Sequence, residues 1–580
     1  MLKRLLAEVK EFKWVSILTP FCMIGEVIAE MIIPRLMARI VDDGINGHNM
    51  QLIISTGGIM IAIALMGLFF GVLGGFFAAR ASAGFARNLR KAMFDNIQTF
   101  SFSNIDKFST SGLVTRLTTD VTNIQNAYMM ILRMAMRAPS SMIIAMIMSL
   151  TISVRLSSIY LVAVAFLICV AAVLMKRVTK YFRQVFERYD ELNESVRENV
   201  RGIRVVKAFV REDYEVDKFR RAAGRIYEMF VKAEKNMTIV MPIMMGTVYT
   251  CILLISYFGA RMIVVEELTT GDLMSLLTYC MNILMSLMMV SMVIVMITMS
   301  QASAKRIVEV MEERTAITNP ENPVYEVADG SIAFHDVSFS YHESSEEPVL
   351  KEINLEIASG EAIGIIGATG SAKSSLVNMI SRLYDVTAGS VTVGGRDVRD
   401  YDLVTLRDAV AVVLQKNELF SGTIYDNLRW GDADATDEEC HEAARLACAD
   451  DFIRDFPDGY NTKIEQGGTN VSGGQKQRLC IARALLKKPK ILILDDSTSA
   501  VDTATDARIR AAFRERIPDT TKLIIAQRIA SVMDLDRIIV MEDGRVNGFG
   551  THDQLMESNE IYRELYESQT SGSRDFDEAS

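Results

Sequence analysis

The most informative stretch of this 580-residue sequence is Gly367-Ala368-Thr369-Gly370-Ser371-Ala372-Lys373-Ser374. It follows the apolar run 362–366 and precedes a helix pattern that begins with Ser375. A glycine-rich loop ending in Lys-Ser between a strand and a helix is a P-loop in its required context. Its backbone N–H groups suit phosphate oxygens. We predict that Lys373 reaches the β- and γ-phosphates of a nucleotide and that Ser374 binds Mg²⁺; the alternative is a chance glycine-rich turn.

Short β-type runs alternate with helix patterns on both sides of this loop. The runs are 332–341, 362–366, 409–414, 491–494, 522–525 and 537–541. Such alternation predicts an α/β domain with a largely parallel sheet. We place this ATP-binding domain at 329–567, after a linker at 314–328. The polar, acidic tail at 568–580 is predicted to be disordered.

The first half of the chain is far more apolar and predicts an all-α membrane domain at 1–313. Six segments are long enough to cross a bilayer at about 20 residues per span. They are 15–40, 52–79, 126–154, 157–175, 238–262 and 271–298. The short connections contain few basic residues, whereas the long ones are rich in Lys and Arg. The positive-inside rule therefore places both termini in the cytoplasm.

The two long connections, 80–125 and 176–237, have helical periodicity. We expect them to continue the spans about 25–40 Å into the cytoplasm and to turn near 102–111 and 205–214. The net charge of −10 argues against nucleic acid as a main partner. The seven cysteines show no metal-ligand spacing, which is typical of free thiols in a reducing compartment.

Two further motifs follow the P-loop. The buried run 491–494 ends in Asp495, and an acid in this place orients Mg²⁺ from the side opposite the loop. Between the two lies Ser472-Gly473-Gly474-Gln475, just before a helix. A serine and two glycines at a helix N-terminus offer a second anion site; a simple turn and cap is the alternative.

Together and in this order, these motifs resemble those of the ABC transporter family, and the resemblance covers nearly the whole chain. It implies an exporter-type half-transporter that uses ATP and Mg²⁺. It also implies roles for matching residues: Tyr341 as the aromatic that stacks on adenine, Gln415 as the Q-loop residue that senses Mg²⁺, Ser374, Gln415 and Asp495 as the Mg²⁺ ligands, Ser472 to Gln475 as the signature motif, and Asp502, after Ser499-Ala500-Val501, as the D-loop aspartate.

In this family two nucleotide domains meet head to tail. The resemblance therefore implies that ATP lies between the P-loop of one chain and the signature of the other. The turns near 102–111 and 205–214 resemble coupling helices, which press on nucleotide domains, and the second usually reaches the partner's domain.

The sequence departs from the family pattern at residues around the nucleotide, including those that the family needs for hydrolysis. Asp496 stands in place of the catalytic glutamate, Gln527 in place of the switch histidine, and Ala372 in place of a P-loop glycine. The binding residues are intact, so this combination resembles the degenerate-site subunit of bacterial heterodimeric multidrug exporters. We predict a chain that retains ATP at its own site and completes the active site of a different partner with its signature. Drift in a poorly working protein is the alternative.

Two features of the membrane half point to a substrate pathway. The last span carries methionines within an arc of roughly 100°, and these form either an adaptable cavity wall or a packing stripe. They are Met274, Met281, Met285, Met288, Met289, Met292, Met296 and Met299. Glu26 and Glu30 lie one turn apart in the first span and could contact a cation. Arg133 and Arg137 have the same spacing in the third span, where we favour ion pairing or snorkelling over contact with a charged substrate.

The expected protein is thus a multi-pass subunit of the bacterial inner membrane that exports drugs or other amphipathic compounds as a heterodimer. The sequence is also compatible with two other hypotheses. The cargo could be lipid, peptide or siderophore, or the protein could be a non-pumping regulator gated by ATP.

Overall fold

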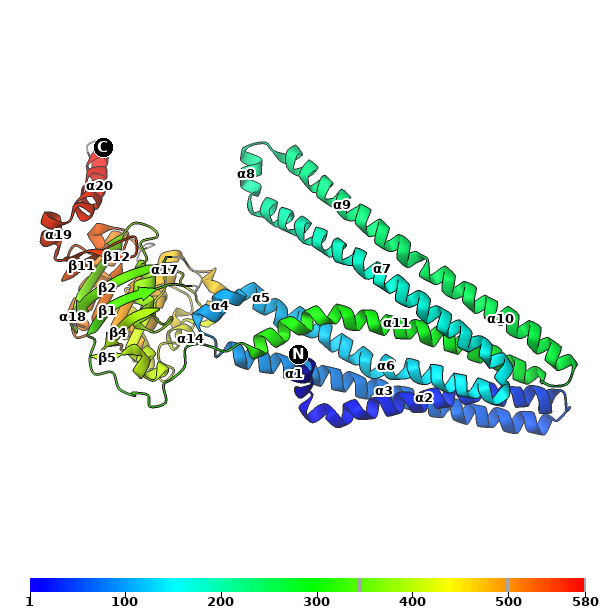
Figure 1. Ribbon diagram of the computed structural model, residues 1–580. Coiled ribbons are helices and arrows are strands. Elements are labelled where there is room, and N and C mark those ends of the chain that lie inside the picture. The colour runs from blue at the N-terminus through cyan, green and yellow to red at the C-terminus, as the bar shows by residue number, and fades with distance from the viewer. Residues whose placement is uncertain (342–346, 497–500, 578–580) are drawn as a thin grey trace. The chain divides into compact units, whose positions relative to one another are not determined.

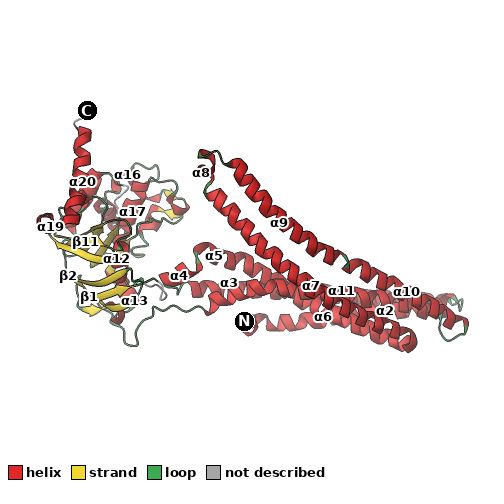
Figure 2. Ribbon diagram, turned by 45° about the horizontal axis from the view of Figure 1, so that its top comes forward, coloured by secondary structure: helices red, strands yellow, loops and turns green. Residues whose placement is uncertain are grey.

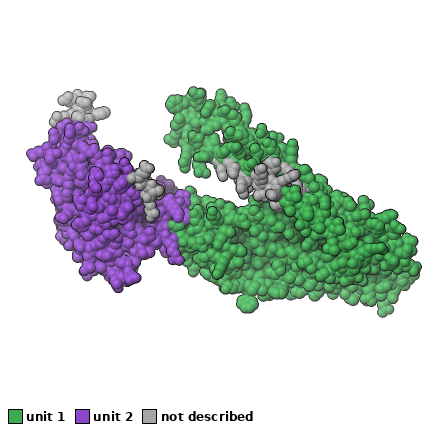
Figure 3. Space-filling model, in the orientation of Figure 1, with its two compact units in different colours: residues 1–98, 110–313 green, residues 99–109, 314–580 purple. Residues whose placement is uncertain are grey.

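The computed structural model describes residues 1–341, 347–496 and 501–577. The chain divides into two compact units, shown in different colours in Figure 3. The first unit comprises Met1–Gln98 and Thr110–Glu313, and the second comprises Thr99–Ser109 and Arg314–Ser580. The short segment Thr99–Ser109 therefore belongs to the second unit, although the sequence analysis assigned it to the membrane domain.

The first unit is entirely helical among its described residues (Figure 2). Its longest helices begin at side-chain caps: Asn49, Ser153 and Thr269 each accept a hydrogen bond from a backbone N–H of the first turn. The elements are α1 (Leu2–Ala7), η1 (Lys10–Phe12), α2 (Lys13–Arg39), η2 (Ile40–Ile45), α3 (Met50–Ile97), α5 (Thr110–Thr115), η3 (Arg116–Asp120), α6 (Val121–Ile152), α7 (Val154–Arg201), α8 (Ile203–Ala208), α9 (Glu212–Thr238), α10 (Val240–Val264) and α11 (Thr270–Glu312).

Five helical stretches of the described chain are long and apolar enough to cross a membrane. A sixth apolar stretch, Val154–Val170, is shorter and forms the start of α7. α3 and α7 contain 48 residues each, which corresponds to about 72 Å. Because a bilayer core is about 30 Å thick, both helices extend well beyond it, as the sequence predicts.

The connection between α7 and α9 turns at α8, in the region where the sequence predicts a turn. α7 and α9 pack against each other along this hairpin, and its tip lies apart from α6 and α11 in both ribbon views (Figures 1 and 2). Apolar side chains at the tip are exposed, including Val205, Phe209 and Val210. The tip of the hairpin therefore presents an exposed apolar surface.

The second unit contains two main sheets. A six-stranded sheet has the order β12-β11-β3-β10-β9-β6, in which only β12 is antiparallel, and a four-stranded antiparallel sheet has the order β2-β1-β4-β5. The strands are β1 (Ile332–Phe339), β2 (Leu350–Ile357), β3 (Ala362–Gly367), β4 (Ala388–Val393), β5 (Arg396–Asp397), β6 (Val410–Val413), β7 (Gly422–Thr423), β8 (Lys463–Ile464), β9 (Ile491–Asp495), β10 (Thr521–Ile525), β11 (Arg537–Glu542) and β12 (Arg545–Gly550).

Helices cover the larger sheet, so its strands are buried on both faces. In β9, Leu492 and Leu494 belong to one apolar cluster whereas Ile491 and Ile493 belong to another. This explains why the parallel strands have continuous apolar runs. The main helices are α12 (Lys373–Ile380), α13 (Leu403–Ala409), α14 (Ile424–Leu428), α15 (Asp437–Leu446), α16 (Asp450–Arg454), α17 (Gly473–Leu486), α18 (Thr503–Arg516), α19 (His552–Ser558) and α20 (Glu560–Asp577).

Two expectations about this unit need correction. The run 332–341 forms β1 of the separate antiparallel sheet and is not part of the parallel one. The tail from residue 568, predicted to be disordered from its polar composition, continues α20 as far as Asp577. The apolar residues of α20 that pack on the domain core lie between Ile561 and Tyr566, so the tail continues a helix that is anchored before it begins.

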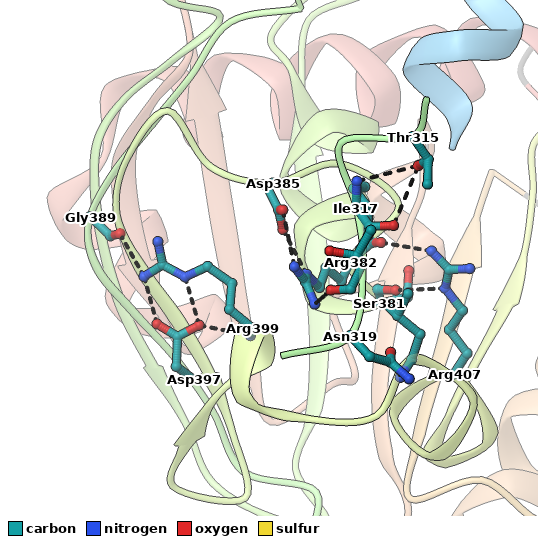
Figure 4. A network of polar contacts seen from close by, with 12 residues as sticks. Thr315, Ile317, Asn319, Ser381, Arg382, Asp385, Gly389, Asp397, Arg399 and Arg407 are labelled. Carbon is teal, nitrogen blue, oxygen red and sulfur yellow. Dashed lines mark hydrogen bonds and ion pairs between the residues drawn. The ribbon is translucent and has the colours of Figure 1, made fainter. Parts of the chain in front are cut away.

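The segment after α11 belongs to the second unit, and a polar network holds it there (Figure 4). Arg382 donates to the carbonyl oxygen of Thr318 at 3.2 Å and is held by Asp385. Asn319 accepts from the backbone N–H of Leu403 at 2.9 Å. The linker is therefore an ordered part of the domain that follows it.

Candidate nucleotide site

Four loops of the candidate site meet at one edge of the parallel sheet. β3, β10, β9 and β6 are neighbours in this order. Since the carboxyl ends of parallel strands lie at the same edge, the segments that follow them converge there. The P-loop follows β3, Gln527 follows β10, Asp496 follows β9 and Gln415 follows β6. The fold thus brings together residues that are up to 160 positions apart, from 367 to 527.

The P-loop connects β3 directly to α12. Lys373 is the first residue of the helix, and its Nζ donates to the carbonyl oxygens of Gly367 at 2.9 Å and Ala368 at 2.8 Å, and to Ser371 Oγ at 3.2 Å. A Cβ on Gly367 would lie 2.2 Å from the carbonyl oxygen of Met541, so only glycine fits there. Around Gly370 the corresponding space is open, which leaves the loop accessible to a ligand.

Ala372 adopts a left-handed conformation, with φ +72° and ψ +22°. Glycine reaches this region without steric cost, whereas an L-residue loses roughly 1–2 kcal/mol. The sequence analysis noted this alanine as a departure from the family pattern. The structure places the strain at Ala372 in its backbone conformation.

Replacing Ala372 by glycine is therefore expected to stabilise the domain. We expect a gain of about 1 kcal/mol in the free energy of unfolding, measured as a rise in the melting temperature. Ala443→Gly in the middle of α15 is the matched control, because the same exchange in a helix interior should destabilise by about 1 kcal/mol. A fall in stability for Ala372→Gly would contradict the strain argument.

Asp495 and Ser374 form the candidate Mg²⁺ site. Ser374 Oγ donates to Asp495 Oδ1 at 3.0 Å. Burial raises the pKa of the Asp495 carboxyl, and the neighbouring Asp496 adds to this rise. A buried carboxylate beside a hydroxyl group is a donor set that suits a hard divalent cation. Mg²⁺, when bound, would supply the positive charge that this pair lacks.

Asp496 and Gln527 contact each other. Gln527 Nε2 donates to Asp496 Oδ2 at 2.8 Å, and the Gln415 side chain also hydrogen-bonds to Asp496. Burial raises the pKa of Asp496, although both amide contacts oppose the rise. Burial lowers the pKa of the nearby Lys373. Asp496 and Gln527, which both depart from the family pattern, therefore form one hydrogen-bonded pair at the sheet edge.

Tyr341 lies beside the P-loop helix. Its hydroxyl is 2.8 Å from Ser375 Oγ, and its ring packs edge-on against Tyr384 with centroids 5.2 Å apart. Tyr384, which the sequence analysis did not single out, donates a hydrogen bond to Asp106 Oδ2 at 2.6 Å in α4 (Phe102–Phe108). The predicted turn near 102–111 is thus joined to the predicted adenine-stacking tyrosine by one aromatic side chain.

The signature motif is not part of this cluster of contacts. Ser472 caps α17, and its hydrogen bonds are exchanged with Gln475 in a capping box. Ser472 and Gly473 are exposed, so the N–H groups of the first turn can meet an external anion. Asp502 caps α18 by accepting from Thr505 N–H at 2.9 Å. Ser499 and Ala500 lie outside the described residues.

The charged residues of the first and third spans contact each other. Arg137 Nη1 donates to Glu26 Oε1 at 2.8 Å, and its Nη2 donates to Glu30 Oε2 at 3.1 Å. Ion pairing, one of the two explanations offered for the arginines, is therefore what the structure shows for Arg137. Arg133 is exposed. One arginine faces two carboxylates, which gives the trio a net negative charge.

The methionine stripe of α11 faces away from the helix-packing core. Cys280, Ile283 and Leu287 on the other face are buried. Met285 and Met292, by contrast, expose 49% and 59% of their surface. Met281 and Met289 are also exposed, and Met288 and Met296 are half-buried. The chain's own helices therefore leave most of the stripe uncovered, which does not fit a packing stripe within this chain.

Comparisons with known proteins agree with this architecture. A family model described as ABC transporter transmembrane region matches residues 16–288, and one described as ABC transporter matches 350–499. An uncharacterised ABC transporter ATP-binding protein of Bacillus subtilis, YfiB, is 36% identical over 98% of both chains. The ATP-dependent lipid A-core flippase of Desulfotalea psychrophila is 32% identical over 84% of this chain and 85% of its own.

A solved structure shows the same fold. The structure of a bacterial Atm1-family ABC exporter with ATP bound superposes with a TM-score of 0.81 and covers 97% of this chain and 99% of its own, at 23% sequence identity. The match covers both the helical unit and the unit with the two main sheets.

Proposed function

Because the chain belongs to the ABC transporter family, as an exporter half-transporter with a membrane and an ATP-binding domain, we propose that it is the degenerate-site subunit of a heterodimeric exporter. Its P-loop retains ATP and Mg²⁺ with little turnover. Its signature, Ser472 to Gln475, completes the hydrolytic site of a different partner chain. The complex lies in a bacterial inner membrane with both termini in the cytoplasm.

The Asp496–Gln527 hydrogen bond carries this proposal. A catalytic carboxylate must be free to hold a water within about 0.5 Å of its productive position. Here the carboxylate is one methylene shorter than glutamate, and an amide donor occupies one of its oxygens at 2.8 Å. Gln527 also cannot become a cation. The predicted nucleotide-binding groups support retention of ATP: Lys373 lies in the P-loop, and Asp495 accepts a hydrogen bond from Ser374.

The purified chain alone is expected to bind ATP but to hydrolyse it far more slowly than typical enzymes, which turn over at about 1–10³ s⁻¹. Equilibrium binding of MgATP and phosphate release measure the two properties on the same sample. Lys373→Ala serves as the control that abolishes binding. Turnover in the typical range by the chain alone would refute the proposal.

The partner would meet this chain at the exposed tip around α8. Its uncovered apolar residues, such as Phe209 and Val210, support docking on the partner's nucleotide domain. The open methionine stripe supports a pathway between the two membrane domains. A partner with glutamate after its Walker aspartate and with a switch histidine would fit this division of labour.

The trio in the first and third spans supports cationic amphipathic compounds as substrates. A cation that enters the pathway can take the place of Arg137 opposite Glu26 or Glu30. Adaptable methionine side chains suit the apolar parts of such compounds. The 32% identity to a lipid A-core flippase favours lipid cargo as the second candidate.

Glu26→Gln is expected to reduce transport of cationic dyes several-fold, by roughly 1 kcal/mol of lost charge interaction, and to leave neutral compounds unaffected. ATP-dependent uptake into inside-out vesicles that contain the partner measures both. Glu321→Gln, an exposed carboxyl in the linker, is the matched control. Equal transport of both classes by Glu26→Gln would exclude this role.

A further inference from the structure

The C-terminal helix α20 contacts the loop that carries Gln527. Gln569 Nε2 donates to the carbonyl oxygen of Gln527 at 2.9 Å, and Gln569 Oε1 accepts from the backbone N–H of Ile529 at 2.9 Å. One side-chain amide thus binds the backbone on both sides of Arg528. It satisfies a carbonyl and an N–H group in the way that a neighbouring strand would.

The position of Gln569 follows from the helix pattern. Ile561, Tyr562, Leu565 and Tyr566 form the apolar face of α20, and Gln569 continues it at the i+4 position from Leu565. This face packs on a cluster that contains Ile366, Ala526 and Ile529. Ile366 precedes the P-loop, and Ala526 precedes Gln527. The same helix face therefore supports both the nucleotide loop and the segment Gln527–Ile529.

We propose that Gln569 is a positioning residue that holds the segment Gln527–Ile529, and with it the Gln527 side chain, against Asp496. Gln527 is fixed at two points: its backbone by Gln569 and its side-chain amide by Asp496 at 2.8 Å. Releasing the backbone contact lets the segment move away from the sheet edge and loosens the nucleotide site. The inference rests on the proposed function in treating Gln527 as part of that site.

Two variants of Gln569 separate its two contacts. Gln569→Ala removes both hydrogen bonds. Gln569→Glu keeps an acceptor for the Ile529 N–H but offers no donor to the Gln527 carbonyl at neutral pH. Glu564→Ala is the matched control, because Glu564 is exposed on the same helix about one and a half turns earlier.

The full-length chain in lipid nanodiscs is used for two measurements. Hydrogen exchange reports the Ile529 amide, and competition by unlabelled MgATP gives the dissociation rate of bound MgATP. We expect Gln569→Ala to speed both about fivefold, as loss of a hydrogen bond near 1 kcal/mol implies. Gln569→Glu should speed nucleotide release but leave the Ile529 amide protected, and Glu564→Ala should change neither.

The outcomes distinguish this inference from the function it builds on. The inference would be overturned if Gln569→Ala sped exchange at Ile529 while neither Gln569 variant changed the rate of MgATP release. The contact would then only anchor α20 to the domain. Unchanged exchange in Gln569→Ala would also overturn it, because the contact would then not exist in solution. Rapid hydrolysis by the unmodified chain would refute the degenerate site but would leave the exchange result on Gln569 intact.

Discussion

Gly474→Asp is expected to lower the ATPase rate of the assembled exporter on the order of 10²-fold, the effect of losing one stabilising donor group. The N-terminus of α17 is the part of this chain that we assign to the partner's nucleotide. A carboxylate in the first helical turn suits the helix itself, so the domain should fold. The same carboxylate repels the triphosphate that the signature would bind.

A substitution in this chain's own nucleotide site is expected to have a much smaller effect, and the comparison tests whether the two sites differ. Asp496→Asn, at the degenerate site, is expected to change the ATPase rate by less than about threefold, or roughly 0.7 kcal/mol. Gly224→Asp in α9 is the control for the substitution itself, because a Cβ there would meet nothing within 4 Å. Phosphate release by the co-purified pair measures all three. Equal losses from Gly474→Asp and Asp496→Asn would show two equivalent sites and contradict the proposal.

The edge of the sheet was predictable from sequence because its chemistry lies directly after apolar strands. The predicted run 491–494 agrees with β9 to within one residue, and 362–366 agrees with β3 equally well. The strand β2 was missed because polar residues interrupt its apolar ones, and β12 was missed because it is short and contains two glycines. In the antiparallel pairs only one face is buried, so no continuous apolar run marks them.

Contacts between distant segments were beyond sequence reasoning. The spacing of Glu26 and Glu30 shows that both face one side of a helix, but not that Arg137 of another helix lies between them. In the same way, the polar composition of the tail predicted disorder and gave no sign of a role for Gln569. Composition does not show that Gln569 continues the apolar helix face that precedes it. A stripe at Ile561, Leu565 and position 569 was the available signal.

Restoring the family residues at the degenerate site is the second large effect that we expect. Asp496→Glu combined with Gln527→His should raise turnover at this chain's P-loop about 10²-fold, at the lower end of what a positioned general base contributes. The added methylene lengthens the reach of the carboxylate by about one C–C bond, roughly 1.5 Å. An imidazole removes the amide that now binds Asp496 at 2.8 Å and can carry a positive charge near neutral pH.

The two substitutions are expected to act together and not separately. Asp496→Glu alone leaves Gln527 able to hydrogen-bond the new carboxylate, and Gln527→His alone leaves the carboxylate too short. The coupling is measured in a double-mutant cycle, in a complex whose partner carries Gln in place of its own catalytic glutamate. Additive single effects would mean that the residues do not form a functional pair. If the double variant shows no gain, the barrier lies elsewhere in the site, and adding Ala372→Gly tests the strained P-loop as its source.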